Sequence, residues 1–171
     1  MRAILSIAML TFMICGAARA QSVGAWGWTR NGGGFAAGTL NRSGDGLVQF
    51  CTPSQRACYW LLGVKAPCQV DAENLVLVNT DVGANALQIK CMGRSADKTD
   101  YSYAFEDFGA IDTAVSNATR IGFALALKNA RFIVARFDLS GERVVVSAMR
   151  QAASAALHPV PHRRVTRDVR V

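Results

Sequence analysis

Histidine is nearly absent from this sequence of 171 residues, since its two copies, His158 and His162, both stand near the C-terminal end. Their position excludes Ser-His-Asp and Cys-His catalysis from the part that we expect to fold. The sequence also lacks a Cys-x-x-Cys motif and a glycine motif that would hold a phosphate group. The spacing of its cysteines does not suit zinc. We therefore predict a protein that is not an enzyme and that holds neither a metal nor a cofactor.

Long apolar runs are confined to the first twenty residues. Arg2 precedes an apolar stretch over 3–14, and Ala18-Arg19-Ala20 fits a small-x-small cleavage site. This pattern predicts a secretory signal peptide over residues 1–20, cleaved after Ala20. No later run reaches the roughly 18 apolar residues that cross a bilayer. Cys15 follows Ile14 rather than the small residue that lipid attachment needs, so we expect Cys15 to leave with the peptide and the mature protein to be periplasmic or secreted.

Four cysteines remain after such a cleavage: Cys51, Cys58, Cys68 and Cys91. An exported protein favours disulfides, and four cysteines allow three pairings. We favour Cys51–Cys58 and Cys68–Cys91, because the first two flank a short loop between expected strands, where Cβ atoms of paired residues lie about 4.5–5.5 Å apart. Each bond should stabilise the fold by about 2–4 kcal/mol. A redox role is the alternative, and it would require the missing Cys-x-x-Cys motif.

The formal net charge of +7 is unevenly distributed along the chain. The expected signal peptide holds two arginines and no acid, and residues 159–171 hold four arginines against one aspartate. The region 21–158 therefore carries only +2, and we expect a single globular domain there. We predict that 159–171 is a disordered tail, with weak contact to anionic surfaces as the functional alternative. That contact would be made by Arg163, Arg164, Arg167 and Arg170.

Alternation of apolar and polar residues is frequent up to about residue 105 and predicts short strands. We expect these strands near 23–30, 35–41, 47–51, 58–64, 75–78, 85–92 and 101–105. Trp26 and Trp28 are two residues apart, so they would share one face of a strand. Core packing of the two tryptophans is favoured over an aromatic platform for a ligand.

The pattern changes at Asp107, after which apolar residues recur at intervals of three and four. It predicts an amphipathic helix capped by Glu106 or Asp107, which runs to about Asn129 or breaks near Gly122. A strand over 131–139 and a second at Val144–Val146 would then form a hairpin, before a short helix over 150–157. The expected fold class is α+β: an antiparallel sheet, as a sandwich or an open barrel, with one amphipathic helix packed on it and a short C-terminal helix.

Three weak candidates for chemistry remain. Ser95-Ala96-Asp97-Lys98 matches the Ser-x-x-Lys pattern of acyl transfer, but the companion motifs are missing. Glu106, Asp107 and Asp112 form an acidic cluster that suits paired carboxylates or a cation, although helix capping explains it more simply. Asn79-Thr80-Asp81 and Asn85 offer oxygen atoms to calcium, without the ligand spacing of an EF-hand loop.

Several segments after the early cysteine pair Cys51 and Cys58 carry a resemblance: Leu127-Lys128, Phe132–Phe137, Gly141–Ser147 and Ala155–Leu157. In these features the chain resembles the invasion-associated locus B family of bacterial secreted proteins. The resemblance implies an early cysteine-bearing hairpin that is followed by a helix, a strand hairpin and a short terminal helix. It also implies an exported, non-catalytic role at the host interface, with no catalytic residues to transfer.

The main hypothesis is an exported, non-enzymatic protein that binds a macromolecular partner in the periplasm or at the cell/host surface. It follows from the expected disulfides and from the absence of catalytic histidines. A small secreted inhibitor of a lysozyme- or protease-type hydrolase is the alternative, with the loop Thr52–Ala57 as the inserting element. A third hypothesis is a hydrolase that uses only carboxylates, such as Glu106 and Asp112.

Overall fold

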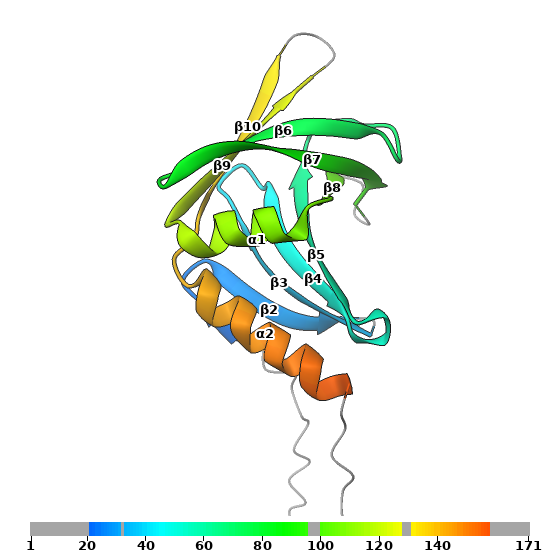
Figure 1. The fold of residues 1–171 in the computed structure, drawn as a ribbon, viewed down its shortest axis with the longest axis vertical. Helices are drawn as coiled ribbons and strands as arrows, with labels where there is room; N and C mark the ends of the chain where they lie inside the picture. Colours follow the sequence, from blue (N-terminus) through cyan, green and yellow to red (C-terminus); the bar gives the residue numbers. More distant parts are fainter. Residues whose placement is uncertain (1–20, 32, 96–99, 128–130, 158–171) are drawn as a thin grey trace, which may run out of the picture.

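The computed structural model describes residues 21–31, 33–95, 100–127 and 131–157 (Figure 1). Its elements in chain order are β1 (Gln21–Val23), β2 (Trp26–Asn31), β3 (Gly34–Leu40), β4 (Gly46–Thr52), the 3-10 helix η1 (Pro53–Gln55), β5 (Ala57–Val64), β6 (Glu73–Thr80), β7 (Gly83–Arg94), β8 (Tyr101–Phe105), α1 (Phe108–Asn117), β9 (Arg120–Ala126), β10 (Phe132–Asp138) and α2 (Glu142–Leu157). The expected signal peptide at 1–20 and the expected basic tail at 159–171 lie outside the described residues.

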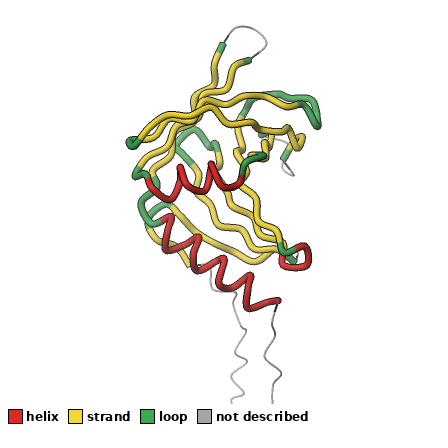
Figure 2. Tube along the Cα trace, viewed as in Figure 1, coloured by secondary structure: helices red, strands yellow, loops and turns green. Residues whose placement is uncertain are grey.

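The described strands form one sheet of ten, in the order β1-β2-β3-β4-β5-β8-β7-β6-β9-β10. Every pairing in it is antiparallel. Two pairings join strands that are not consecutive in the chain, β5 with β8 and β6 with β9. The sheet is strongly curved, and the two helices lie against its inner face (Figure 2).

The expected α+β class is wrong, because the sheet dominates the described residues and the two helices cover only part of one face. One source of the error lies after α1. This helix ends at Asn117, and Arg120–Ala126 forms strand β9. In β9 the side chains of Ile121, Phe123 and Leu125 are buried and alternate with more exposed neighbours. The two-residue period within this stretch therefore decides its structure, and the helical spacing of Ile121 from α1 is coincidental.

The C-terminal region is the second source of the error. The expected strand at Val144–Val146 is instead part of helix α2, which begins at Glu142. The residues that α2 buries recur at intervals of three and four, and they are Glu142, Val145, Val146, Met149 and Ala153. This buried face packs against strands β1 to β4. The packing of one continuous helical face outweighs the strand preference of three consecutive valines.

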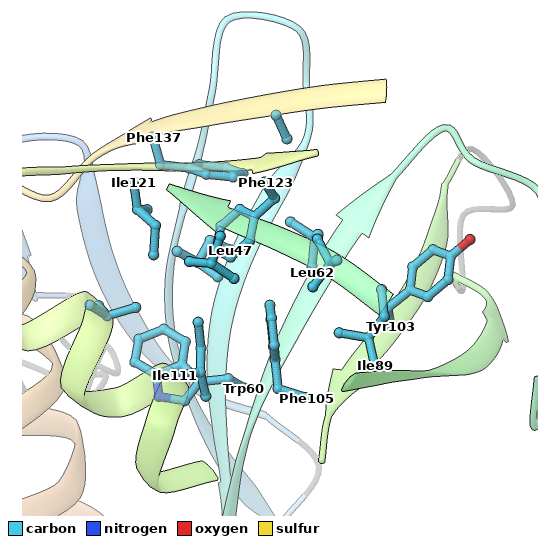
Figure 3. Packing of buried hydrophobic residues seen from close by; sticks show 14 of the residues in the cluster. Leu47, Trp60, Leu62, Ile89, Tyr103, Phe105, Ile111, Ile121, Phe123 and Phe137 are labelled. Atoms are coloured by element: carbon cyan, nitrogen blue, oxygen red, sulfur yellow. The ribbon is translucent and has the colours of Figure 1, made fainter. Parts of the chain in front are cut away.

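The core lies between the inner face of the sheet and the two helices (Figure 3). Trp26 and Trp60 are completely buried, and their rings meet edge to face with centroids 6.3 Å apart. Trp28, on the same strand as Trp26, is partly buried and contacts the ring of Phe35. The two early tryptophans are thus parts of the core packing, and they do not form an exposed aromatic platform.

Two disulfides link elements within the described residues. Cys51–Cys58 joins facing positions on β4 and β5, and Cys68–Cys91 ties the segment after β5 to β7. These are the two pairings that the sequence favoured. Paired disulfides of this kind are typical of exported proteins. In the part of the chain that the structure describes, no helix is long and apolar enough to cross a membrane.

Candidate functional site

Asp112 belongs to a cluster of four polar side chains beneath the helices. The cluster, which we call the polar latch, consists of Gln49 of β4, Trp60 of β5, Asp112 of α1 and Arg150 of α2. Trp60 Nε1 donates to Asp112 Oδ1 at 2.9 Å, and Gln49 Nε2 donates to the same oxygen at 3.2 Å. Arg150 forms an ion pair with Asp112, and its Nε donates to Gln49 Oε1 at 2.7 Å. The latch therefore fastens both helices to the sheet.

Glu142, in the first turn of α2, is a buried acid that the sequence did not single out. Its side chain is 2% exposed, and burial raises the pKa of its carboxyl above the ordinary value of 4.5. The charge of Asp112 raises that pKa further, whereas Arg150 and Arg143 act in the opposite direction. Asp112 and Glu142 are therefore two acids whose charges interact in this fold. The sequence signal for Glu142 is its position directly after Gly141, where an apolar pattern with helical spacing begins.

The other two acids of the expected cluster have separate roles. The Asp107 carboxylate accepts a hydrogen bond from the Ala110 N–H at 2.9 Å, which confirms that Asp107 caps α1. Glu106 is exposed, and its N–H donates to the carbonyl of Gln88. Among the described residues no recorded contact joins Glu106 to Asp112. The arrangement therefore offers no paired carboxylates at Glu106 and Asp112.

Asp81 stands in the turn between β6 and β7, where calcium was considered. Its carboxylate accepts hydrogen bonds from Thr119 Oγ1 at 2.6 Å and from the Thr119 N–H at 2.9 Å. These hydrogen bonds lower the pKa of Asp81 to about 2. Asn85 is likewise engaged locally, because its Oδ1 accepts the Ala86 N–H. Asp81 thus anchors the start of β9, and the described residues contain no group of three His, Cys, Asp or Glu side chains that could hold a metal.

The Ser-x-x-Lys pattern is only partly described, since Lys98 lies outside the described residues. The Ser95 hydroxyl donates to the Asp100 carbonyl at 3.1 Å and accepts the Asp100 N–H at the same distance. Ser95 therefore takes part in the turn that precedes β8.

A hollow of about 440 Å³ lies where β6, β9 and β10 meet, and we call it the arginine hollow. In the strand register Gly122 stands between Asn79 of β6 and Arg136 of β10. Because Gly122 has no side chain, the surface of the sheet has a depression at this point. Arg120, also in the lining, is paired in the register with Asp138.

The charges around the arginine hollow are unequally satisfied. The Asp138 carboxylate accepts the Ser140 N–H at 2.7 Å. Hydrogen bonding by the Ser140 side chain and then by its backbone, together with the charge of Arg120, lowers the pKa of Asp138. Asp81 is held by Thr119 in the same way. Within the described part of the chain, the guanidinium groups of Arg120 and Arg136 have no recorded hydrogen bond or ion pair. Among the described residues the hollow therefore presents Arg136 without a recorded partner, and Arg120, whose charge acts on the Asp138 carboxylate that Ser140 already hydrogen-bonds.

A second hollow, of about 420 Å³, lies on the other side of β10, and we call it the edge hollow. Its lining includes Val134 and Arg136 of β10, Leu40 at the end of β3, and Arg42 in the turn that follows. Strand β10 stands last in the order of the sheet, so the edge hollow borders a strand that pairs on one side only with the strands that the structure describes.

The backbone of β10 offers alternate residues to this free edge. The Leu139 N–H bonds to Thr119 and the Arg131 carbonyl accepts from Leu127, so odd-numbered residues face β9. By alternation the N–H and C=O groups of even-numbered residues point away from β9. At Asp138 the outward carbonyl accepts Trp26 Nε1 at 3.0 Å. For Val134 and Arg136, the structure records no partner for these groups among the described residues.

The loop Thr52–Ala57, considered as an inhibitory element, is closed by the Cys51–Cys58 disulfide and contains η1. Ser54, Gln55 and Arg56 are exposed, and η1 lies against α2. The loop is thus a short, fixed projection.

The chain can be compared with known proteins by sequence and by fold. No protein-family model matches the sequence, and no curated protein matches it. The structure is similar to the crystal structure of invasion associated protein B from Bartonella henselae, with a TM-score of 0.55 and 10% sequence identity. The match covers 80% of this chain and 99% of that chain. The two proteins share a fold. The resemblance given from the sequence is therefore confirmed as a structural resemblance.

Proposed function

We propose that this chain is an exported, non-enzymatic protein that binds a macromolecular partner in the periplasm or at the cell/host surface. The binding surface in this proposal is the region around β10, formed by the arginine hollow and the edge hollow. The observation that carries it is the guanidinium group of Arg136, which has no recorded partner among the described residues and lies with Arg120 beside a strand edge that no described strand pairs. Cations that have no internal partner are available to a ligand.

The roles of the acids support binding over catalysis. Asp112 accepts hydrogen bonds from two neutral donors and forms an ion pair with Arg150, and Asp107 caps a helix. Export is supported by the two disulfides. The structural neighbour is an invasion associated protein of Bartonella henselae, which supports a role at a host surface.

The proposal can be tested with two variants that replace arginine by glutamine on different surfaces. Arg120→Gln/Arg136→Gln removes the cations of the arginine hollow, and Arg56→Gln removes an exposed cation from the loop Thr52–Ala57. Envelope and host-surface fractions should yield a protein that wild type and Arg56→Gln retain and that the double variant loses. Equal retention by all three proteins, with unchanged folding, would remove the β10 region as the binding surface.

A second candidate is a small inhibitor of a lysozyme- or protease-type hydrolase. It is favoured by the disulfide-closed projection that exposes Ser54, Gln55 and Arg56. This candidate predicts inhibition of such enzymes at micromolar protein, weakened by Arg56→Gln and not by the double arginine variant. Unaltered hydrolase activity at that concentration would eliminate it.

A further inference from the structure

We infer that the free edge of β10 binds an extended, acidic segment of a partner protein as an added β-strand. This inference rests on the proposed function and specifies how the same surface holds its partner. It requires backbone groups that are free to pair, neighbouring side chains that accept a strand, and charges that select an acidic one. The described residues supply all three.

The backbone groups come from the even-numbered residues of β10. Val134 and Arg136 direct their N–H and C=O groups away from β9, where no described strand pairs with them. Such an edge is a template for another strand. The indole of Trp26 already occupies the carbonyl of Asp138, so the free stretch ends there. Phe132 to Arg136 remain, which corresponds to about 17 Å of extended chain.

The side chains beside this edge suit a strand with alternating character. On the outer face Phe132 is 69% exposed and Val134 is 45% exposed, whereas Ala135 is completely buried. An added strand would cover the exposed apolar atoms and direct its other side chains into the edge hollow. Apolar and polar residues in alternation satisfy both requirements.

The charge of the surroundings selects the partner. Arg42 lines the edge hollow, Arg120 lines the arginine hollow, and Arg136 lines both. Asp138 also lines both hollows, but its carboxylate is hydrogen-bonded by Ser140 and interacts with the charge of Arg120. Arg42 and Arg136 have no recorded hydrogen bond or ion pair within the described residues. They favour a ligand with carboxylates. They disfavour residues 159–171 of this chain, which hold four arginines, and a second copy, which would bring the same arginines together.

A peptide that alternates valine and glutamate over eight residues tests the inference on the full chain. It should bind, and its valine–lysine counterpart should bind at least about tenfold more weakly. Val134→Pro removes an N–H that does not pair with β9, so the fold should persist while affinity for the peptide falls about tenfold or more. Val134→Thr keeps that N–H and should bind within about threefold of wild type.

Hydrogen exchange in the wild-type protein provides a second measurement that needs no variant. The peptide should protect the amides of Val134 and Arg136 and leave those of Ala135 and Phe137 unchanged. Equal binding of the Val134→Pro and Val134→Thr proteins would overturn strand addition. If Arg120→Gln/Arg136→Gln then still lost its partner, the proposed function would stand without this binding mode. Concentration-dependent protection of Val134 without peptide would assign the edge to a second copy and reject the inference.

Discussion

The two edges of the sheet are built in opposite ways. Strand β1 has three residues and packs against α2, and Gly141 lies so close that a Cβ there would come within 2.4 Å of the Val23 carbonyl oxygen. Strand β10 has seven residues and exposes Phe132 and Val134. Short, covered edges resist pairing with other chains, whereas long apolar edges invite it. Under the proposed function, β1 is closed for stability and β10 is open for binding.

The closed edge depends on how α2 is held. Helix α2 buries one face on β1 to β4, and its Arg150 enters the polar latch. At its start Arg143 donates to the carbonyl of Ser116 near the end of α1. No helix is packed in this way on the β10 edge in the described part of the chain. Variants in the contacts of α2 should therefore affect stability, and variants at β10 should affect binding.

The largest expected effect is at the closed edge. Gly141→Ala should destabilise the fold by about 3 kcal/mol, because φ is +92° and the new Cβ would displace backbone atoms of Val23. Gly44→Ala is the matched control, since Gly44 also has a positive φ but has no atom within 4 Å of an added Cβ. It should cost only about 1–2 kcal/mol. Urea unfolding would measure the free energy of unfolding of both variants. Equal losses of that free energy would show that β1 is not closely covered.

The second-largest expected effect on stability is at the polar latch. Asp112→Ala removes the acceptor for Trp60 and Gln49 and the ion-pair partner of Arg150, so it should destabilise the fold by about 2 kcal/mol. Asp71→Asn removes the charge from the exposed ion pair with Lys90, keeps a residue that tolerates the positive φ of +66° at this position, and should leave the thermal midpoint unchanged. Similar midpoints for the two variants would mean that the latch does not hold α2.

The stability contributions of acids near the two edges should also depend on pH in different ways. Burial raises the pKa of Glu142, so its contribution to stability is complete below pH 4.5 and is lost as the pH rises through the folded pKa. Glu142→Gln should therefore raise the thermal midpoint at pH 7 and have little effect at pH 4.

Asp81, near β10, should behave in the opposite sense. Its pKa is lowered to about 2 by Thr119, so its contribution is present above pH 3.8 and is lost as the pH falls through 2. Asp81→Asn should lower the midpoint at pH 7, and the difference should vanish toward pH 2. Midpoint shifts of the same sign for both variants at pH 7 would contradict this assignment.

Local periodicity predicted much of the sheet, because an alternating stretch such as Asn85–Met92 needs no distant information to be recognised as a strand. It failed where two patterns overlap. The valines at 144–146 prefer strands in isolation, and only the packing of α2 on β1 to β4 makes them helical. The expected fold class is wrong for this reason and because the helical spacing continues to Ile121, which belongs to β9.

The candidate site could not be predicted from the sequence in the same way. Arg120 and Arg136 stand on different strands, and only the register of β9 with β10 places them around Gly122 and Asp138. The apolar run Leu75–Val78, which does not alternate, lines neither hollow. Leu75 and Leu77 are exposed on the outer face, so the run marks a surface and not a strand that is buried on both sides.

Residue-resolved hydrogen exchange of the free, monomeric protein tests the contrast between the edges most directly. The amides of Val134 and Arg136 should exchange rapidly while those of Ala135 and Phe137 are protected, and the β1 amides that bond to β2 should exchange slowly. Asp112→Ala should accelerate exchange at β1 and leave β10 unchanged. Equal protection of Val134 and Ala135 in the free protein would contradict an open edge at β10.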